Sequence, residues 1–169
     1  MKIAIALGLG SLLTLTATTL TARADSEGSP PFRAEIAGGI AARPTGDARF
    51  GITGGTDGAP AVFTISLGAG GASGSILFTR RSGAPLVPGT YKISAREDRT
   101  DDLRALVMTG SASRPTGVFQ GQRGSLVVTY ASEREIRGSF RLEATGFLAA
   151  APEVEDRPIT ASGLFIASR

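Results

Sequence analysis

The chain has 169 residues, with 18 basic and 15 acidic side chains and without cysteine, histidine or tryptophan. The absence of Cys and His excludes disulfides, thiol nucleophiles, Ser-His-Asp triads and the ordinary zinc, copper and haem sites. The basic surplus is small, the arginines are dispersed, and aromatic residues make up only 6% of the chain, so nucleic-acid binding is not indicated.

Residues 1–24 have the pattern of a secretory signal peptide. Lys2 precedes an uncharged, apolar and threonine-rich run, and Ala22-Arg23-Ala24 fits the small-x-small cleavage pattern. We expect cleavage before Asp25, export to the periplasm or the extracellular space, and no stable membrane insertion of the mature chain. The alternative is an uncleaved anchor, since about 18 apolar residues can span a bilayer. Loss of Lys2 and Arg23 lowers the net charge from +3 to +1.

Residues 25–31 form a polar leader, and 32–169 read as one all-β domain. Apolar residues recur at every second position over short runs, which is the period of a strand with one buried face. Turns rich in Gly and Pro separate these runs. We expect strands, in chain order, at 32–41, 48–52, 61–67, 75–80, 86–94, 103–109, 118–121, 124–130, 135–147 and 158–168. Residues 43–47 read as a turn, and 147–157 as an irregular link with room for a one-turn helix at 147–151.

The closing stretch, 124–166, carries the clearest alternation. Its last two strands each place Gly two residues before Phe: Gly138 before Phe140, and Gly163 before Phe165. A strand glycine lets a neighbouring ring lie close over it. We therefore expect each Phe to cover a Gly on the adjoining strand and to fix the register. The alternative is that both glycines mark bulges.

These patterns predict an antiparallel β-sandwich of about nine or ten strands, with a closed β-barrel as the alternative. An outer-membrane barrel is disfavoured because such barrels carry aromatic girdles. The core must hold the domain together without disulfides.

The strongest cluster of possible metal ligands is acidic. Asp98, Asp101 and Asp102, with Glu97 nearby, are a weak candidate for Ca²⁺. Their spacing departs from the D-x-D-x-D-G loop and arginines lie among them, so a solvated hairpin tip is the preferred interpretation. A second acidic group, at 153–156, is no stronger. We predict no catalytic or cofactor-binding residues and no bound cofactor.

Two other patterns resemble functional motifs. The glycines of 68–74 are spaced G-x-G-G-x-x-G, but the following residues read as a strand, whereas a phosphate-binding loop needs a helix N-terminus. Lys92, the sole lysine after the predicted signal peptide, lies in an alternating strand and should face solvent, which disfavours a Ser-Lys dyad.

The segments GSLVVTYASEREIRGSFRLEATGF, ITASGLFIAS and PLVPGTYKI together resemble parts of small exported bacterial β-sandwich domains of unknown function. The resemblance covers about 80 residues and rests on short structural motifs. It implies an exported all-β fold, and it carries no catalytic or ligand residues.

Three functions remain open. The preferred one is a non-enzymatic structural or interaction module in the bacterial envelope, with a protein partner. The second is a carrier of a small apolar ligand in a cavity lined by Phe63, Ile65, Phe78, Phe140 and Phe165. The third is a hydrolase that works through two carboxylates.

Overall fold

The computed structural model describes residues 29–55, 60–69, 73–96, 98–111, 114–153 and 156–169. This part of the chain contains ten strands and no helix, and all strand pairs but one are antiparallel. The prediction of an all-β domain with nine or ten antiparallel strands is therefore confirmed. No helix in the described ranges is long and apolar enough to cross a membrane. The predicted signal peptide, and the leader as far as residue 28, lie outside the described residues.

All ten strands belong to one hydrogen-bonded sheet. Their bounds are β1 Phe32–Gly38, β2 Thr45–Gly46, β3 Ala48–Thr53, β4 Val62–Leu67, β5 Ser75–Arg80, β6 Gly89–Ser94, β7 Arg104–Ser111, β8 Arg114–Ala131, β9 Glu135–Leu148 and β10 Arg157–Ser168.

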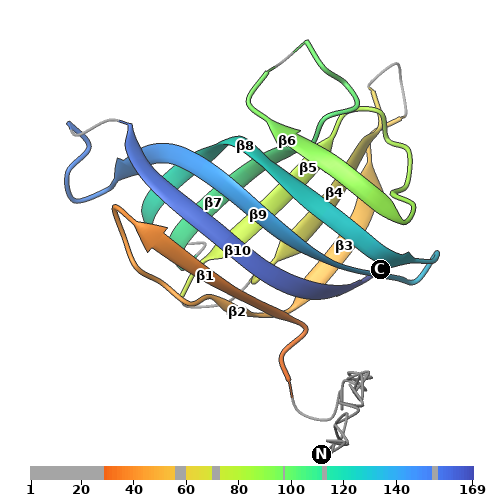
Figure 1. The fold of residues 1–169 in the computed structure, drawn as a ribbon, viewed down its shortest axis with the longest axis horizontal. Coiled ribbons are helices and arrows are strands. Elements are labelled where there is room, and N and C mark those ends of the chain that lie inside the picture. The colour runs from red at the N-terminus through yellow and green to blue at the C-terminus, as the bar shows by residue number, and fades with distance from the viewer. Residues whose placement is uncertain (1–28, 56–59, 70–72, 97, 112–113, 154–155) are drawn as a thin grey trace, which may run out of the picture.

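The sheet folds over so that two layers face each other (Figure 1). One layer contains β1, β10, β9, β8 and β6, and the other contains β7, β5, β4 and β3. At one side the layers are continuous, because β8 pairs with both β7 and β9. At the other side they meet in a single parallel pair, between Ser168 of β10 and Arg49 of β3.

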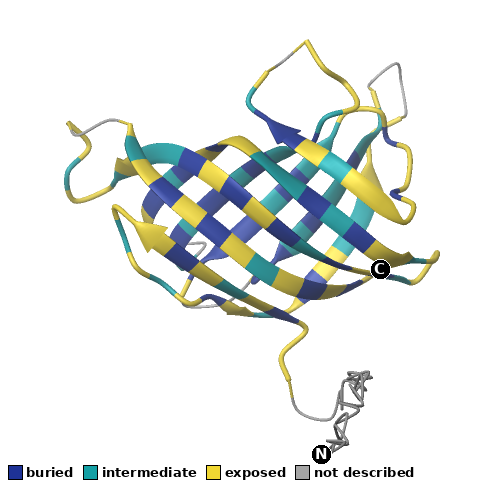
Figure 2. Ribbon diagram, viewed as in Figure 1, coloured by how far each residue is buried: buried dark blue, intermediate teal, exposed yellow. Residues whose placement is uncertain are grey.

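The core lies between the layers. Buried and exposed residues alternate along the strands, as Figure 2 shows, because successive side chains point to opposite faces. Phe63, Ile65 and Leu67 of β4 are at most 1% exposed, which confirms the predicted inward face of that strand. Across the interior, the rings of Phe78 and Phe140 meet edge to face with centroids 5.3 Å apart. The two layers are thus in direct contact through aromatic side chains.

The predicted break between strands 118–121 and 124–130 is wrong. Both segments belong to β8, an 18-residue strand that pairs with β9 along its length. The register shifts between Gly121 and Arg123, and Gly124 has a φ of +154°. A bulge therefore bends the strand without ending it, and glycine tolerates the backbone angle that it requires.

Two smaller expectations also need correction. The predicted turn at 43–47 contains β2, in which Thr45 and Gly46 pair with the first residues of β1. The segment 147–151 is not a helical turn: β9 continues to Leu148, and the Ala151 N–H donates to the Leu148 carbonyl at 3.0 Å in an antiparallel bridge. Pairing with β1 outweighs the local turn signal at 45–46, whereas the Leu148–Ala151 bond closes a two-residue turn directly after β9.

Candidate functional site

The acidic cluster does not assemble into a metal site. Asp98 and Asp101 are exposed, and Asp101 accepts a hydrogen bond from Arg80 Nη2 at 3.2 Å. Asp102 is partly buried, and Glu97 lies outside the described residues. In the described ranges, no three Asp, Glu, His or Cys side chains are placed to hold a metal ion. Asp101 is therefore paired with a cation of the protein itself.

Among the surface hollows of the described residues, we compared five of 250 to 530 Å³, and none of these brings two acidic side chains together. Each is lined by at most one acidic side chain, so none offers the facing pair that glycoside hydrolysis requires. In the second acidic group, Glu153 is exposed and residues 154–155 lie outside the described part.

The other sequence motifs also stay apart from any site. Lys92 is exposed on β6, as predicted. The glycines at 70 and 71 lie outside the described residues, and the strand β5 begins one residue after Gly74. The described part of this loop therefore leads into a strand and not into the helix N-terminus that a phosphate site needs.

The five side chains proposed to line an interior cavity belong to one packed core. Their exposed fractions do not exceed 4%, and they form a single cluster with the other buried apolar residues. The members are Phe63, Ile65, Phe78, Phe140 and Phe165. The interior at these positions is filled by the protein's own side chains.

An apolar hollow of about 450 Å³ lies at the end of the molecule near the label C in Figure 1. We call it the end hollow. It is contributed by β3 and the start of β4, by the segment before β6, by the turn between β8 and β9, and by the end of β10. Its lining residues are Phe50, Gly51, Ile52, Phe63, Pro85, Leu86, Val87, Pro88, Ala131, Ser132, Glu133, Ile136 and Arg169.

The end hollow lies beyond the last pair between β3 and β10. β3 and β10 share one pair, Arg49 with Ser168; beyond it, β3 follows β4, and Arg169 donates its backbone N–H to the Arg134 carbonyl at 3.2 Å. Ile52 shares the inward face of β3 with Ala48, which is 3% exposed, yet Ile52 is 47% exposed. The apolar face of β3 thus continues past the point where the opposite layer covers it.

The segment on the other side of the end hollow is held by the hydroxyl group of a partly buried tyrosine. The Tyr91 hydroxyl donates to the Val87 carbonyl at 2.9 Å and accepts from the Val87 N–H at 2.8 Å. The guanidinium of Arg80 lies 5.6 Å from the centroid of the same ring, within range of a cation–π contact. These contacts fix the backbone at Val87, whose side chain is 62% exposed, next to Leu86, which is 2% exposed.

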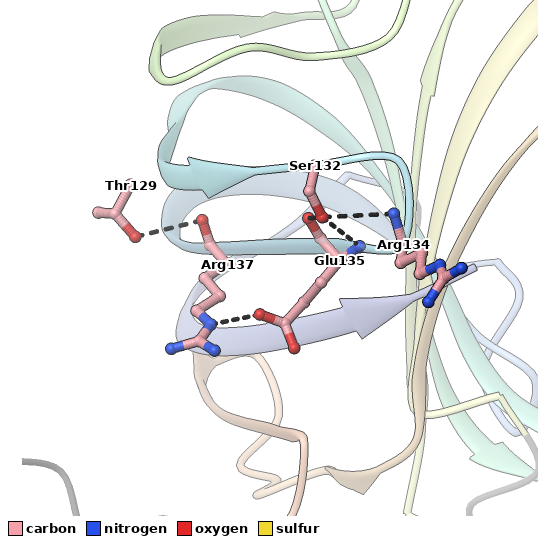
Figure 3. Close-up of polar contacts among 5 residues, drawn as sticks. All are labelled: Thr129, Ser132, Arg134, Glu135 and Arg137. Carbon is pink, nitrogen blue, oxygen red and sulfur yellow. Dashed lines mark hydrogen bonds and ion pairs between the residues drawn. The ribbon is translucent and has the colours of Figure 1, made fainter.

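The β8–β9 turn is similarly constrained (Figure 3). The Ser132 hydroxyl oxygen accepts hydrogen bonds from the backbone N–H groups of Arg134 and Glu135, at 3.3 and 3.0 Å. The Ser132 N–H donates to the Glu135 carbonyl at 2.8 Å. The walls of the end hollow are therefore ordered by hydrogen bonds on both sides, which lowers the entropy cost of binding there.

One ionisable group outside the end hollow has a clearly shifted pKa. Arg123 lies on β8 opposite Glu143 of β9, and its Nε is 2.7 Å from Glu143 Oε2. The hydrogen bond to Glu143, and then the charge attraction, raise the pKa of Arg123. Both side chains are exposed, so this pair is a surface ion pair.

Comparison of the chain with protein-family models, with curated proteins and with solved structures gives no match in any of the three. The end hollow is thus interpreted from its own geometry. Sequence analysis missed it, although two signals were present: an apolar residue, Ile52, directly before a glycine-rich loop, and the apolar run Leu86-Val87 between prolines.

Proposed function

We propose that this protein is an exported, non-enzymatic interaction module that binds another protein of the bacterial envelope through the end hollow. The observation that carries the proposal is a contrast in burial. The core is packed, whereas Ile52 and Val87 hold apolar side chains in water at the rim of a preformed hollow. Apolar surface at a constrained, concave position is typical of a binding site.

The proposal that the protein is not an enzyme has separate support. The chain lacks His and Cys, and the five hollows lack a pair of carboxylates, so the groups that most often carry acid–base or nucleophilic chemistry are missing from them. Export is supported by the signal-like pattern of residues 1–24.

A carrier of a small apolar ligand is the second candidate. The volume of the end hollow, about 450 Å³, lies in the range of small-molecule sites. This ligand would sit at the end of the molecule, and not between the Phe side chains of the core.

The experiment is native mass spectrometry of the protein purified from its own envelope under mild conditions. We expect a mature mass that begins at Asp25 and a bound protein partner. Val87→Asp should abolish the partner's copurification, because a carboxylate would be desolvated in the hollow. Leu164→Asp is the matched control, since Leu164 is 49% exposed on another surface. A bound small molecule in place of a protein would favour the carrier, and a partner retained by Val87→Asp would exclude the end hollow as the binding site.

A further inference from the structure

The edge of β3 beside the end hollow lacks a neighbouring strand after Arg49. Among the described residues, Phe50–Thr53 pair only with β4. β10 reaches this edge with Ser168, and the Arg169 N–H bonds to the β8–β9 turn. A row of backbone groups without a neighbouring strand is a template for another extended chain.

The register shows which backbone groups face this open edge. The Gly68 N–H donates to the Asp47 carbonyl at 2.7 Å, directly before the first β3–β4 pair. In an antiparallel pair, residues that bond to the partner strand alternate with residues that do not. Every second residue from Asp47 onward therefore bonds to β4. The residues between them direct their backbone groups to the other edge, where β10 pairs at Arg49 through Ser168 and Ile52 lies beyond that pair.

Neither face of the strand obstructs this edge. Ile52 is 47% exposed at the rim of the end hollow. On the opposite face, a Cβ built on Gly51 would meet no atom within 4 Å. The usual protections of a sheet edge are a covering segment, a proline or an inward charge. Phe50–Thr53 contain no proline, and among the described residues they pair with no strand besides β4.

We propose that an extended peptide segment of a partner protein adds to β3 as a further strand, pairs with the backbone of Ile52, and places an apolar side chain in the end hollow. This inference rests on the proposed function above and specifies the partner's chemistry: an extended segment with apolar side chains at alternate positions. A small apolar ligand would fill the hollow but would leave the Ile52 N–H and carbonyl without a strand partner. A bound peptide would fill the hollow with a side chain and would also pair with the Ile52 backbone.

The test uses the mature chain labelled with ¹⁵N and a blocked pentapeptide, Thr-Val-Thr-Val-Thr, as the probe. Two control peptides have the same sequence and keep its side chains. In one, N-methylation of the valines removes the N–H donors along one edge of the peptide. In the other, N-methylation of the threonines removes the N–H donors along the opposite edge. We expect the unmodified peptide to shift the amide signals of Gly51, Ile52 and Thr53 and to slow hydrogen exchange at Ile52. Methylation on the pairing edge should weaken binding by about tenfold, because it leaves polar backbone groups unpaired.

Variants of the protein separate strand addition from apolar contact. Ile52→Pro removes the outward N–H and, by the alternation above, spares the bonds to β4, and proline is tolerated on edge strands. Ile52→Val keeps the N–H and is the matched control; circular dichroism shows whether each variant is folded. We expect about tenfold weaker binding for Ile52→Pro and little change for Ile52→Val.

The outcomes distinguish the two proposals. Strand addition is overturned by a peptide that does not bind at millimolar concentration, or by binding that is indifferent to both methylated peptides and to Ile52→Pro. If a partner protein is still lost on Val87→Asp but retained by Ile52→Pro, the interaction module stands and strand addition fails. If neither variant affects the partner, both proposals fail.

Discussion

Phe140 lies directly opposite Gly163 in the antiparallel pairing of β9 and β10, and its Cε1 is 2.9 Å from the position that a Cβ on Gly163 would occupy. The reciprocal pair has the same arrangement: Phe165 lies opposite Gly138, with Cζ 3.0 Å from that glycine's Cβ position. The expectation that each ring covers a glycine on the adjoining strand is confirmed. Because a shift by one residue would place side chains under both rings, these pairs specify the register.

Gly163→Ala should destabilise the domain by about 1–3 kcal/mol, since the new methyl group would meet both the Phe140 ring and the Arg33 carbonyl oxygen. Urea denaturation followed by circular dichroism measures this. The control is Gly51→Ala, also within a strand, where a Cβ meets no atom within 4 Å. We expect its effect to stay within about 0.5 kcal/mol. Equal losses in the two variants would show that the contact with Phe140 does not limit residue size at position 163.

The sequence was sufficient to predict which face of each strand points to the interior. A strand with one buried face repeats its apolar residues with period two, so Phe63, Ile65 and Phe140 could be assigned to the interior from spacing alone. The length of β8 could not, because its glycines at 121 and 124 read as a turn. Only pairing with β9 decides whether a glycine ends a strand or forms a bulge in it, and pairing is a long-range property.

The end hollow likewise depends on contacts that the local sequence does not reveal. Ile52 was predicted to lie on the inward face of its strand, and it does. It is nevertheless exposed, because the last pair between β3 and β10 is at Arg49. The side chain of Val87 is exposed, and the Tyr91 hydroxyl holds its backbone. Neither the pairing of two strands far apart in sequence nor a hydroxyl–backbone contact has a local sequence signature. The acidic residues were conspicuous in the sequence, yet they remain on the solvated loop.

Phe140→Ala should cost about 3–5 kcal/mol, because the ring is 4% exposed and packs edge to face on Phe78. Phe147→Ala, on the same strand but 42% exposed, should cost less than about 1 kcal/mol. Chemical denaturation of both variants gives the comparison. A small loss for Phe140→Ala would mean that the interior is not packed around this ring, and would restore the carrier with an internal cavity.

Tyr91→Phe removes the hydroxyl that bonds to both the N–H and the carbonyl of Val87, and keeps the ring under Arg80. We expect a loss of about 1 kcal/mol in the free energy of unfolding and faster hydrogen exchange at Val87. Tyr130→Phe, at a position that is 48% exposed, is the control and should leave both quantities unchanged. Unaltered exchange at Val87 in Tyr91→Phe would show that other contacts order this wall of the end hollow.

Calcium should not stabilise the protein. A site that binds the folded state raises the free energy of unfolding by about 2.7 kcal/mol at a ligand concentration a hundred times the dissociation constant. Asp98, Asp101 and Asp102 do not converge in the structure, and Asp101 pairs with Arg80. We therefore expect the same thermal midpoint in millimolar CaCl₂ and in chelator, with MgCl₂ as the control for ionic effects. A calcium-specific rise in the midpoint, lost in Asp101→Asn, would revive the acidic loop as a metal site.

The stability should be nearly independent of pH between about pH 6 and about pH 8, because the chain has no histidine or cysteine to titrate there. The shifted group, Arg123, has a pKa raised by its hydrogen bond to Glu143 and then by the attraction of that carboxylate. A base whose pKa is higher in the folded state contributes stability that is complete below the unfolded pKa, and loses it as the pH rises through the folded value. For an arginine this loss falls in strongly alkaline solution, outside the window. Urea denaturation across this pH range gives the free energy of unfolding and tests the expectation. A change of more than about 1 kcal/mol in that free energy would reveal a carboxylate whose pKa is raised toward neutrality in the folded protein.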